Sequence, residues 1–186
     1  MKAGVGRTTR RGFLRVCAGV AGLAGLSGAP WVVRGAAPVA AASERITVGL
    51  IGVGRMGRGH LRRLAGDVGV QLLAVCDVDR QRRNDAQQSV EAAYAAGRAD
   101  GTYRGCAAYN DYRELLARPD VDAVVIVTPD HWHSLISIDA AKAGKDVYCE
   151  KPISVTIHES RMLVEAIRRY ARVFQTGTQY RSIPTI

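Results

Sequence analysis

The chain has 186 residues and carries 26 basic against 17 acidic side chains, a formal net charge of +9. The basic excess is uneven, because residues 1–42 hold six of the Lys and Arg residues and none of the Asp and Glu residues, which leaves 20 against 17 and a net charge of +3. The high overall charge is therefore no indication of a nucleic-acid partner. The 144 residues that follow are a normal size for one domain with a buried core.

The first 42 residues have the order of a cleaved signal peptide, with a basic head, an uncharged stretch over residues 16–33, and small residues up to Ala42. Arg10 and Arg11, followed by Gly12-Phe13-Leu14-Arg15, resemble a twin-arginine signal. We therefore expect the folded protein to be carried by the twin-arginine translocation machinery and to be periplasmic or secreted. The alternative is an uncleaved anchor, but glycines and a proline in the apolar stretch argue against stable membrane anchoring.

Residues 46–51 form a short apolar run that predicts a strand, and residues 56–65 are predicted to form a helix. Between them the loop Gly52-Val53-Gly54-Arg55-Met56-Gly57 fits the pattern G-x-G-x-x-G. In such a loop the first glycine permits a tight turn, the second lets a pyrophosphate approach the backbone, and the third lets helix and strand pack closely. The phosphates then lie at a helix N-terminus. Its position between a strand and a helix predicts a dinucleotide-binding loop.

Residues 70–76 predict a second strand, and Asp77 follows at its end, 25 positions beyond Gly52. An acidic residue at this place accepts hydrogen bonds from the adenosine ribose and repels a 2′-phosphate, which favours NAD over NADP. The alternative is that Asp77 or Asp79 caps the helix predicted over residues 80–96. Arg80 is close enough to leave NADP as the second choice of cofactor.

A short third strand is predicted near residues 103–108, followed by a helix over 111–117. This helix opens with the pair Asp111 and Glu114, which can cap it by satisfying the exposed amides of its first turn. Residues 122–128 predict a fourth strand. The turn Thr128-Pro129-Asp130-His131-Trp132-His133 leaves this strand at its carboxyl end, where open α/β sheets bind ligands. His131 and His133 are interpreted as site residues, and the alternative is a helix start that Asp130 caps, with Trp132 packed inward.

The helix over residues 133–143 is followed by a fifth strand over 146–149 and then by Cys149-Glu150-Lys151-Pro152. A lysine at this edge of the sheet could hydrogen-bond a substrate hydroxyl or the nicotinamide ribose. The alternative is an ordinary solvated lysine. A helix over residues 157–171 and a strand over 172–176 complete the alternation.

Strands that alternate with helices predict an α/β fold with a doubly wound, mostly parallel sheet, the Rossmann architecture. Cys76, Cys106 and Cys149 are odd in number and their spacing is unlike that of a zinc site, which argues against a disulfide framework and against a metal centre. The two nearby histidines also lack the spacing of a metal site.

In this order the segments GLIGVGRMG, VCDVD, TPDHWH and YCEKP resemble the Gfo/Idh/MocA family, from about residue 46 to residue 184. The resemblance implies a dinucleotide-binding domain and NAD(P)-dependent oxidation or reduction of a sugar, a polyol or a derivative. By match of motif, the dinucleotide would be held by Gly52, Gly54, Met56 and Asp77, with Arg55 and Gly57 in the same loop. The nicotinamide end would be lined by Thr128, Pro129, His131, His133, Glu150 and Lys151, with Lys151 nearest to a catalytic role.

The resemblance also predicts the organisation of the chain: a signal peptide over residues 1–42, the dinucleotide-binding domain over 43–178, and the start of a substrate domain over 179–186. Members of the family continue into an α+β domain that shapes the sugar pocket and often forms the subunit interface. We therefore expect a truncated reading frame or a fragment, and a homo-oligomer for a full-length form. Two alternatives stay open: a glycosidase that uses tightly bound NAD, and a nucleotide-binding module without catalysis.

Overall fold

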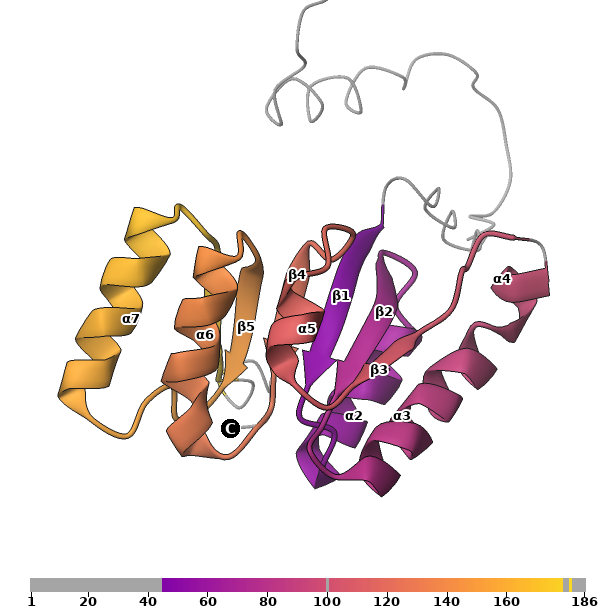
Figure 1. The fold of residues 1–186 in the computed structure, drawn as a ribbon, viewed down its shortest axis with the longest axis horizontal. Coiled ribbons are helices and arrows are strands. Elements are labelled where there is room, and N and C mark those ends of the chain that lie inside the picture. Colours follow the sequence, from indigo (N-terminus) through magenta and orange to yellow (C-terminus); the bar gives the residue numbers. More distant parts are fainter. Residues whose placement is uncertain (1–44, 100, 179–180, 182–186) are drawn as a thin grey trace, which may run out of the picture. The chain divides into compact units, whose positions relative to one another are not determined.

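The computed structural model describes residues 45–99, 101–178 and 181, and within them a parallel six-stranded sheet lies between two layers of helices (Figure 1). The predicted signal peptide, and the predicted second-domain start apart from Arg181, lie outside the described residues. The elements are β1 (Ile46–Ile51), α2 (Arg55–Ala65), β2 (Val70–Cys76), α3 (Arg80–Ala93), α4 (Ala95–Ala99), β3 (Ala107–Tyr109), α5 (Tyr112–Leu116), β4 (Ala123–Ile126), the 3₁₀ turn η2 (Asp130–Trp132), α6 (His133–Lys142), β5 (Asp146–Glu150), α7 (Ile157–Arg169) and β6 (Phe174–Gly177).

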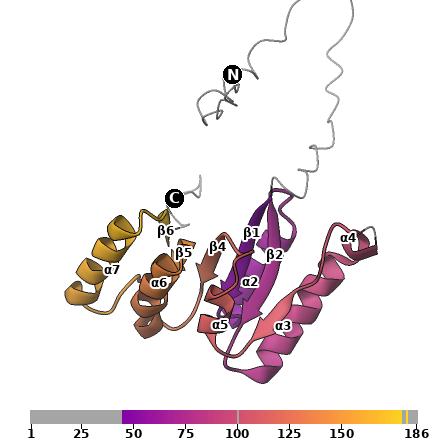
Figure 2. The same cartoon turned by 45° about the horizontal axis from the view of Figure 1, so that its top comes forward.

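The strands lie in the order β3-β2-β1-β4-β5-β6, and every neighbouring pair is parallel. The chain runs outward from β1 to β3 and then crosses back to β4 on the other side of β1. Because of this reversal, α2 and α3 lie on one face of the sheet while α5, α6 and α7 lie on the other (Figure 2). The predicted doubly wound α/β fold is thereby confirmed. The carboxyl ends of β1 and β4 lie side by side at the point of reversal, where folds of this kind bind ligands.

The core sits on both faces of the central strands. Side chains with no exposed surface include Leu50 on β1, Leu72 on β2 and Ile126 on β4. This double-sided burial explains why the strands read as continuous apolar runs instead of alternating with polar residues. On the face that α5 covers the packing is close, since a Cβ on Gly49 of β1 would lie 2.5 Å from Cδ2 of Leu115 on α5.

The helices match the predictions except where a tertiary contact intervenes. The helix predicted over residues 80–96 ends at Ala93, and α4 begins after Tyr94. The Tyr94 hydroxyl accepts a hydrogen bond from the backbone N–H of Leu72 at 3.3 Å, and its ring lies 4.8 Å from that of Tyr103. These contacts hold Tyr94 against the sheet, and its backbone leaves the helical conformation there. Asp111 caps α5 as predicted, accepting a hydrogen bond from Arg113 N at 2.9 Å.

The three cysteines of the described region are free and buried. Burial raises the pKa of Cys76 and of Cys106 to about 12 and that of Cys149 to about 11. The thiols are therefore protonated at neutral pH and serve as core side chains. Among residues 45–99, 101–178 and 181, no group of three His, Cys, Asp or Glu side chains is placed to hold a metal ion. In the same part of the chain, none of the helices has the length and apolar character needed to cross a bilayer.

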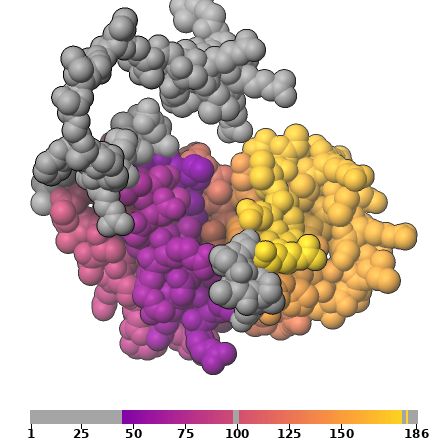
Figure 3. Space-filling view, turned by 180° about the vertical axis from the view of Figure 1, so that it is seen from behind, coloured from indigo at the N-terminus to yellow at the C-terminus, as the bar shows by residue number. Residues whose placement is uncertain are grey.

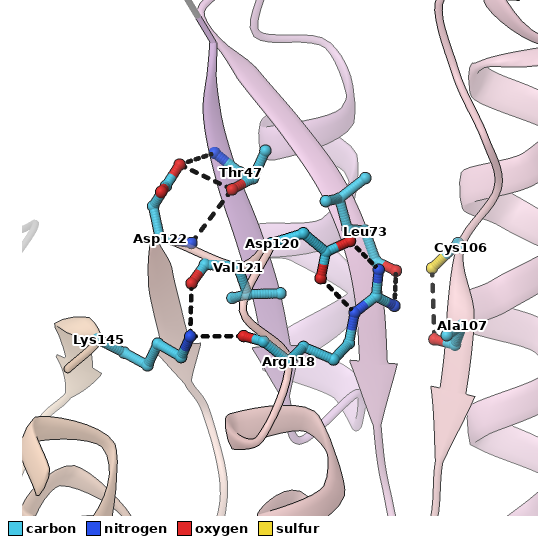
Figure 4. A network of polar contacts seen from close by, with 9 residues as sticks. All are labelled: Thr47, Leu73, Cys106, Ala107, Arg118, Asp120, Val121, Asp122 and Lys145. Atoms are coloured by element: carbon cyan, nitrogen blue, oxygen red, sulfur yellow. Dashed lines mark hydrogen bonds and ion pairs between the residues drawn. The ribbon is translucent and has the colours of Figure 1, made fainter. Parts of the chain in front are cut away.

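A polar network holds the amino ends of the strands, at the edge opposite the point of reversal (Figure 4). The buried Lys145 ammonium donates to the carbonyl oxygens of Arg118 at 2.5 Å and Val121 at 2.8 Å. Asp122, just before β4, accepts hydrogen bonds from both the backbone N–H and the hydroxyl of Thr47 on β1. These bonds fix the register of β1, β4 and β5, and they lie far along the strands from the glycine loop.

Candidate functional site

The glycine loop has the backbone geometry that its pattern predicts. Gly52 adopts a φ of +89°, and a Cβ there would lie 2.6 Å from the carbonyl oxygen of Val127. A Cβ on Gly57 would overlap the carbonyl oxygen of Gly52. Gly54 differs from both, because the nearest atom to its Cβ position is Nη1 of Arg82 at 3.7 Å. Gly52 and Gly57 therefore allow the loop to pack, whereas Gly54 leaves open space for a ligand.

A pocket of about 580 Å³ lies over this loop at the carboxyl ends of β1, β2 and β4. Seven of the predicted cofactor residues line it: Gly52, Gly54, Arg55, Met56, Asp77, Thr128 and Pro129. Its other side chains include Arg82, Asn110, Arg113 and Trp132. A larger, more open hollow of about 750 Å³ lies beside Cys106 and Arg118 and contains none of the predicted site residues. The point of strand reversal thus brings together residues from four separate segments of the chain.

The sequence left open whether Asp77 binds the ribose or whether Asp77 or Asp79 caps the next helix, and in the structure the two residues have different positions. The Asp79 carboxylate caps α3, where Oδ1 accepts a hydrogen bond from Arg82 N at 3.0 Å, and this bond is the main cause of its lowered pKa. Asp77 instead lines the pocket. Its Oδ2 accepts the backbone N–H of Val53 at 2.8 Å, and its Oδ1 accepts that of Asp79 at 2.9 Å. A carboxylate oxygen can accept a second hydrogen bond, so Asp77 is oriented by the glycine loop and still able to receive ribose hydroxyls.

Thr128, which also lines the pocket, carries an unused polar atom. Its Oγ1 is buried and has no hydrogen-bond partner among the described residues. Buried hydroxyls normally have partners. Together with the open space above Gly54 and the oriented carboxylate of Asp77, this atom fits a bound dinucleotide, whose phosphates and sugars supply both donors and acceptors.

The two predicted histidines of the turn are held differently. His131 is exposed and lies 3.6 Å from the Asp130 carboxylate. His133 is buried, with Nδ1 2.5 Å from the carbonyl oxygen of Pro152 and Nε2 2.8 Å from that of Thr128. Each ring nitrogen thus lies close to a backbone carbonyl oxygen from a different loop. His133 therefore ties the turn after β4 to the loop after β5.

The alternative interpretation of the helix start is wrong on both points, the packing of Trp132 and the capping by Asp130. Trp132 is not packed inward, because 41% of its surface is exposed and it borders the pocket. The Asp130 carboxylate accepts a hydrogen bond from the adjacent His131 N–H, in the 3₁₀ turn before α6. No side-chain cap closes α6, whose first residue is His133. The turn is thus shaped by the contacts of His133, which leave Trp132 free to cover the pocket.

Glu150 and Lys151 lie at the carboxyl end of β5, beside the pocket but not among its lining residues. The Glu150 side chain is buried, and Oε1 lies 2.8 Å from Nε2 of His60 on α2. The Lys151 side chain is exposed. The contact of a cofactor with His131, His133, Glu150 or Lys151 stays a prediction, and the first role of His133 and Glu150 in this structure is to hold the two loops.

His60, Arg82 and Trp132 were not identified as site residues from the sequence. The segment RMGRGHLRRLA of α2 looks like a basic surface helix, and nothing in it marks His60 as buried. Arg82 lies between two other basic residues, Arg80 and Arg83, in a polar helix. Their roles depend on partners from distant parts of the chain, such as Glu150, which is 90 positions from His60.

The chain is similar in sequence to known proteins. A family model described as "Oxidoreductase family, NAD-binding Rossmann fold" (GFO_IDH_MocA) matches residues 46–178. An inositol 2-dehydrogenase of Salmonella typhimurium (strain LT2) is 36% identical over 134 residues, which are 71% of this chain and 36% of that protein. A glycosyl hydrolase family 109 protein of Shewanella pealeana is 33% identical over 126 residues, 68% of this chain and 27% of that protein.

Solved structures show the same arrangement. The myo-inositol 2-dehydrogenase of Lactobacillus plantarum matches with a TM-score of 0.65 at 26% identity, over 76% of this chain and 38% of that one. The scyllo-inositol dehydrogenase of Lactobacillus casei, solved with bound NAD(H) and scyllo-inositol, matches with a TM-score of 0.65 at 26% identity, over 75% and 38%. The chain therefore spans little more than a third of the length of these dehydrogenases.

Proposed function

The chain belongs to the Gfo/Idh/MocA family of oxidoreductases and forms the NAD-binding Rossmann domain of that family. We propose that it is the nucleotide-binding half of an NAD-dependent enzyme that oxidises or reduces a sugar, a polyol or a derivative. The observation that carries this proposal is the pocket at the strand reversal, which Gly54, Asp77 and Thr128 line together and which has open space above Gly54.

The pocket offers a distinct contact to each part of a dinucleotide. The loop at Gly54 and the N-terminus of α2 would receive the pyrophosphate, since backbone N–H groups at a helix start attract anions. Asp77 would accept hydrogen bonds from the adenosine ribose, and Thr128 would contact the nicotinamide half. The bound cofactor supplies hydride transfer, and the protein supplies its position and the exclusion of water. NAD is preferred to NADP because the Asp77 carboxylate would repel a 2′-phosphate.

Lys151 is the residue that we assign to the chemistry. Its exposed ammonium follows directly after β5, at the same sheet edge as the pocket. There it would donate a hydrogen bond to the reacting hydroxyl and stabilise the negative charge that develops on oxygen as hydride leaves carbon. This role places the substrate on the side of the nicotinamide that faces the loop after β5.

A second candidate function is an NAD-dependent glycosidase, favoured by the 33% identity to the family 109 hydrolase. The two activities differ in whether NADH accumulates. An oxidoreductase forms NADH in proportion to product. We expect this when a form of the protein that turns over substrate is loaded with NAD and given inositols or hexoses, and absorbance is followed at the nicotinamide band. A glycosidase regenerates its NAD in each turnover, so cleavage of aryl glycosides without net NADH would replace our proposal by the second candidate.

We also propose export by the twin-arginine pathway, because the sequence carries Arg10 and Arg11 in the same chain as a cofactor-binding domain. Dinucleotides are made in the cytoplasm, so an exported enzyme of this kind needs to bind NAD before translocation of the folded protein. Replacing both Arg10 and Arg11 by lysine is expected to leave the protein in the cytoplasm, as measured by cell fractionation. Unchanged export of that double variant, or a nucleotide-free exported protein, would contradict the proposal.

A further inference from the structure

The loop that carries Lys151 is anchored from behind by a buried polar cluster. We define this cluster as His60 on α2, Tyr148 and Glu150 on β5, and Gly177 on β6. His60 is 5% and Glu150 4% exposed. Nε2 of His60 lies 2.8 Å from Oε1 of Glu150, and because a carboxylate only accepts, the imidazole is the donor. The backbone N–H of Lys151 donates to the other oxygen of the same carboxylate, Oε2, at 3.3 Å.

The space for this carboxylate is part of the fold. A Cβ on Gly177 would lie 2.9 Å from Oε1 of Glu150 and 2.8 Å from the hydroxyl oxygen of Tyr148. The Tyr148 hydroxyl lies 3.5 Å from Oε1, and its ring lies 5.5 Å from that of His60. Figure 3, seen from behind, shows the purple surface of the part of the fold that includes α2 and the yellow surface of the part that includes β6. Residues from α2, β5 and β6 thus surround one carboxylate.

Burying a polar pair is seldom the most stable choice for a core. Well-packed apolar residues of similar volume are often as stable as a buried ion pair, or more so. Stability alone therefore does not explain the cluster, and the elements that it connects indicate its role. One end of its hydrogen-bond chain is α2, whose N-terminus faces the pocket, and the other end is the peptide of Lys151.

We infer that His60 is a positioning residue for Lys151. By donating a hydrogen bond to Glu150, it keeps that carboxylate buried and turned away from the Lys151 ammonium. The same hydrogen bond links the loop after β5 to α2, the helix at the phosphate end of the pocket. Without His60, the carboxylate is free to turn toward the neighbouring ammonium and pair with it. An opposite charge at such short range stabilises the protonated amine. This inference rests on the proposed function, which gives Lys151 its task.

The test measures the reactivity of Lys151 in the 186-residue chain with an amine-acylating ester, read residue by residue by mass spectrometry. In His60→Leu we expect the acylation rate of Lys151 to fall about tenfold, as one pKa unit of ammonium stabilisation would cause. His60→Gln, which can place an amide N–H close to the position of Nε2, is expected to restore most of the rate. Lys142, an exposed lysine of α6, is the internal reference and should not change.

Two controls separate positioning from a general loss of stability. Lys145→Met removes the two buried hydrogen bonds of Figure 4 at the opposite edge of the sheet, and it should lower the urea midpoint without altering Lys151. In a Glu150→Gln background, His60→Leu should have no further effect on Lys151, because the negative charge is already gone. An unchanged Lys151 rate in His60→Leu, or an equal fall in Lys145→Met, would overturn the inference.

A nucleotide arm tests the proposed function separately. NAD is expected to protect Lys151 of the unmodified chain from acylation while Lys142 continues to react. If NAD binds without protecting Lys151, the placement of this lysine at the nicotinamide end fails. The Lys151 acylation rates of His60→Leu and His60→Gln, compared in the nucleotide-free chain, still decide whether His60 sets the reactivity of Lys151.

Discussion

Replacing Gly57 by alanine is expected to lower the free energy of unfolding by about 2–3 kcal/mol and to weaken NAD binding by more than about tenfold. The new Cβ would overlap the carbonyl oxygen of Gly52. That oxygen has little freedom to move, because the backbone N–H of Gly52 is bonded to the carbonyl oxygen of Cys76 at 2.8 Å. The variant must therefore push α2 away from β1, which displaces the loop that would hold the pyrophosphate. Urea unfolding and calorimetric titration with NAD measure the two effects.

The same helix offers a matched control. A Cβ on Gly59 would meet nothing within 4 Å, so Gly59→Ala should be stabilising by about 0.5–1 kcal/mol through helix propensity alone and should leave NAD binding unchanged. Gly54→Ala should keep the stability of the chain, since its nearest neighbour is the flexible Arg82 at 3.7 Å, but its methyl group would enter the pocket and weaken binding. If Gly57→Ala bound NAD as well as Gly59→Ala, the close packing of loop and helix would not be what shapes the site.

The second large effect is expected at Lys151. In a form of the protein that turns over substrate, Lys151→Ala should lower kcat by about 10²–10⁴-fold, the range for loss of a proton-transferring or charge-stabilising group. The dissociation constant of NAD should change far less, because Lys151 is not among the residues that line the pocket. Steady-state kinetics and calorimetry on the same preparation separate the two quantities.

Lys142→Ala is the control for this prediction. Lys142 is an exposed lysine whose ammonium lies 3.4 Å from the Asp139 carboxylate, and it borders a different hollow from the predicted cofactor residues. Its removal should leave both kcat and NAD affinity unchanged. An unchanged kcat in Lys151→Ala would remove this residue from the mechanism and leave the negative charge on the substrate oxygen to be stabilised by another group.

The sequence predicted those features of the fold that depend on neighbouring residues. Continuous apolar runs identified β1, β2 and β4 because strands buried on both faces need no polar side. The glycine loop was recognisable because its steric demands fall on fixed positions, and the structure shows these demands at Gly52 and Gly57. Asp111 was predicted as a cap from a pattern only four residues long, and it caps α5.

Features that depend on distant partners could not be predicted in this way. The break between α3 and α4 follows from the contact of Tyr94 with Leu72, 22 positions away. Motif matching assigned His133 and Glu150 to the cofactor, but their polar atoms face protein partners: His133 faces the carbonyl oxygens of Thr128 and Pro152, and Glu150 faces His60. A pattern shows that a residue type recurs at a position, whereas its hydrogen-bond partner is fixed only by the packing of separate segments.

The measurement that most directly tests the central claim is calorimetric titration of the folded 186-residue chain with NAD and, separately, with NADP. We expect saturable binding of NAD, and weaker binding of NADP because the 2′-phosphate would approach the Asp77 carboxylate. The absence of binding heat with either nucleotide at several temperatures, from a chain shown by circular dichroism to be folded, would contradict the assignment of this pocket as a dinucleotide site.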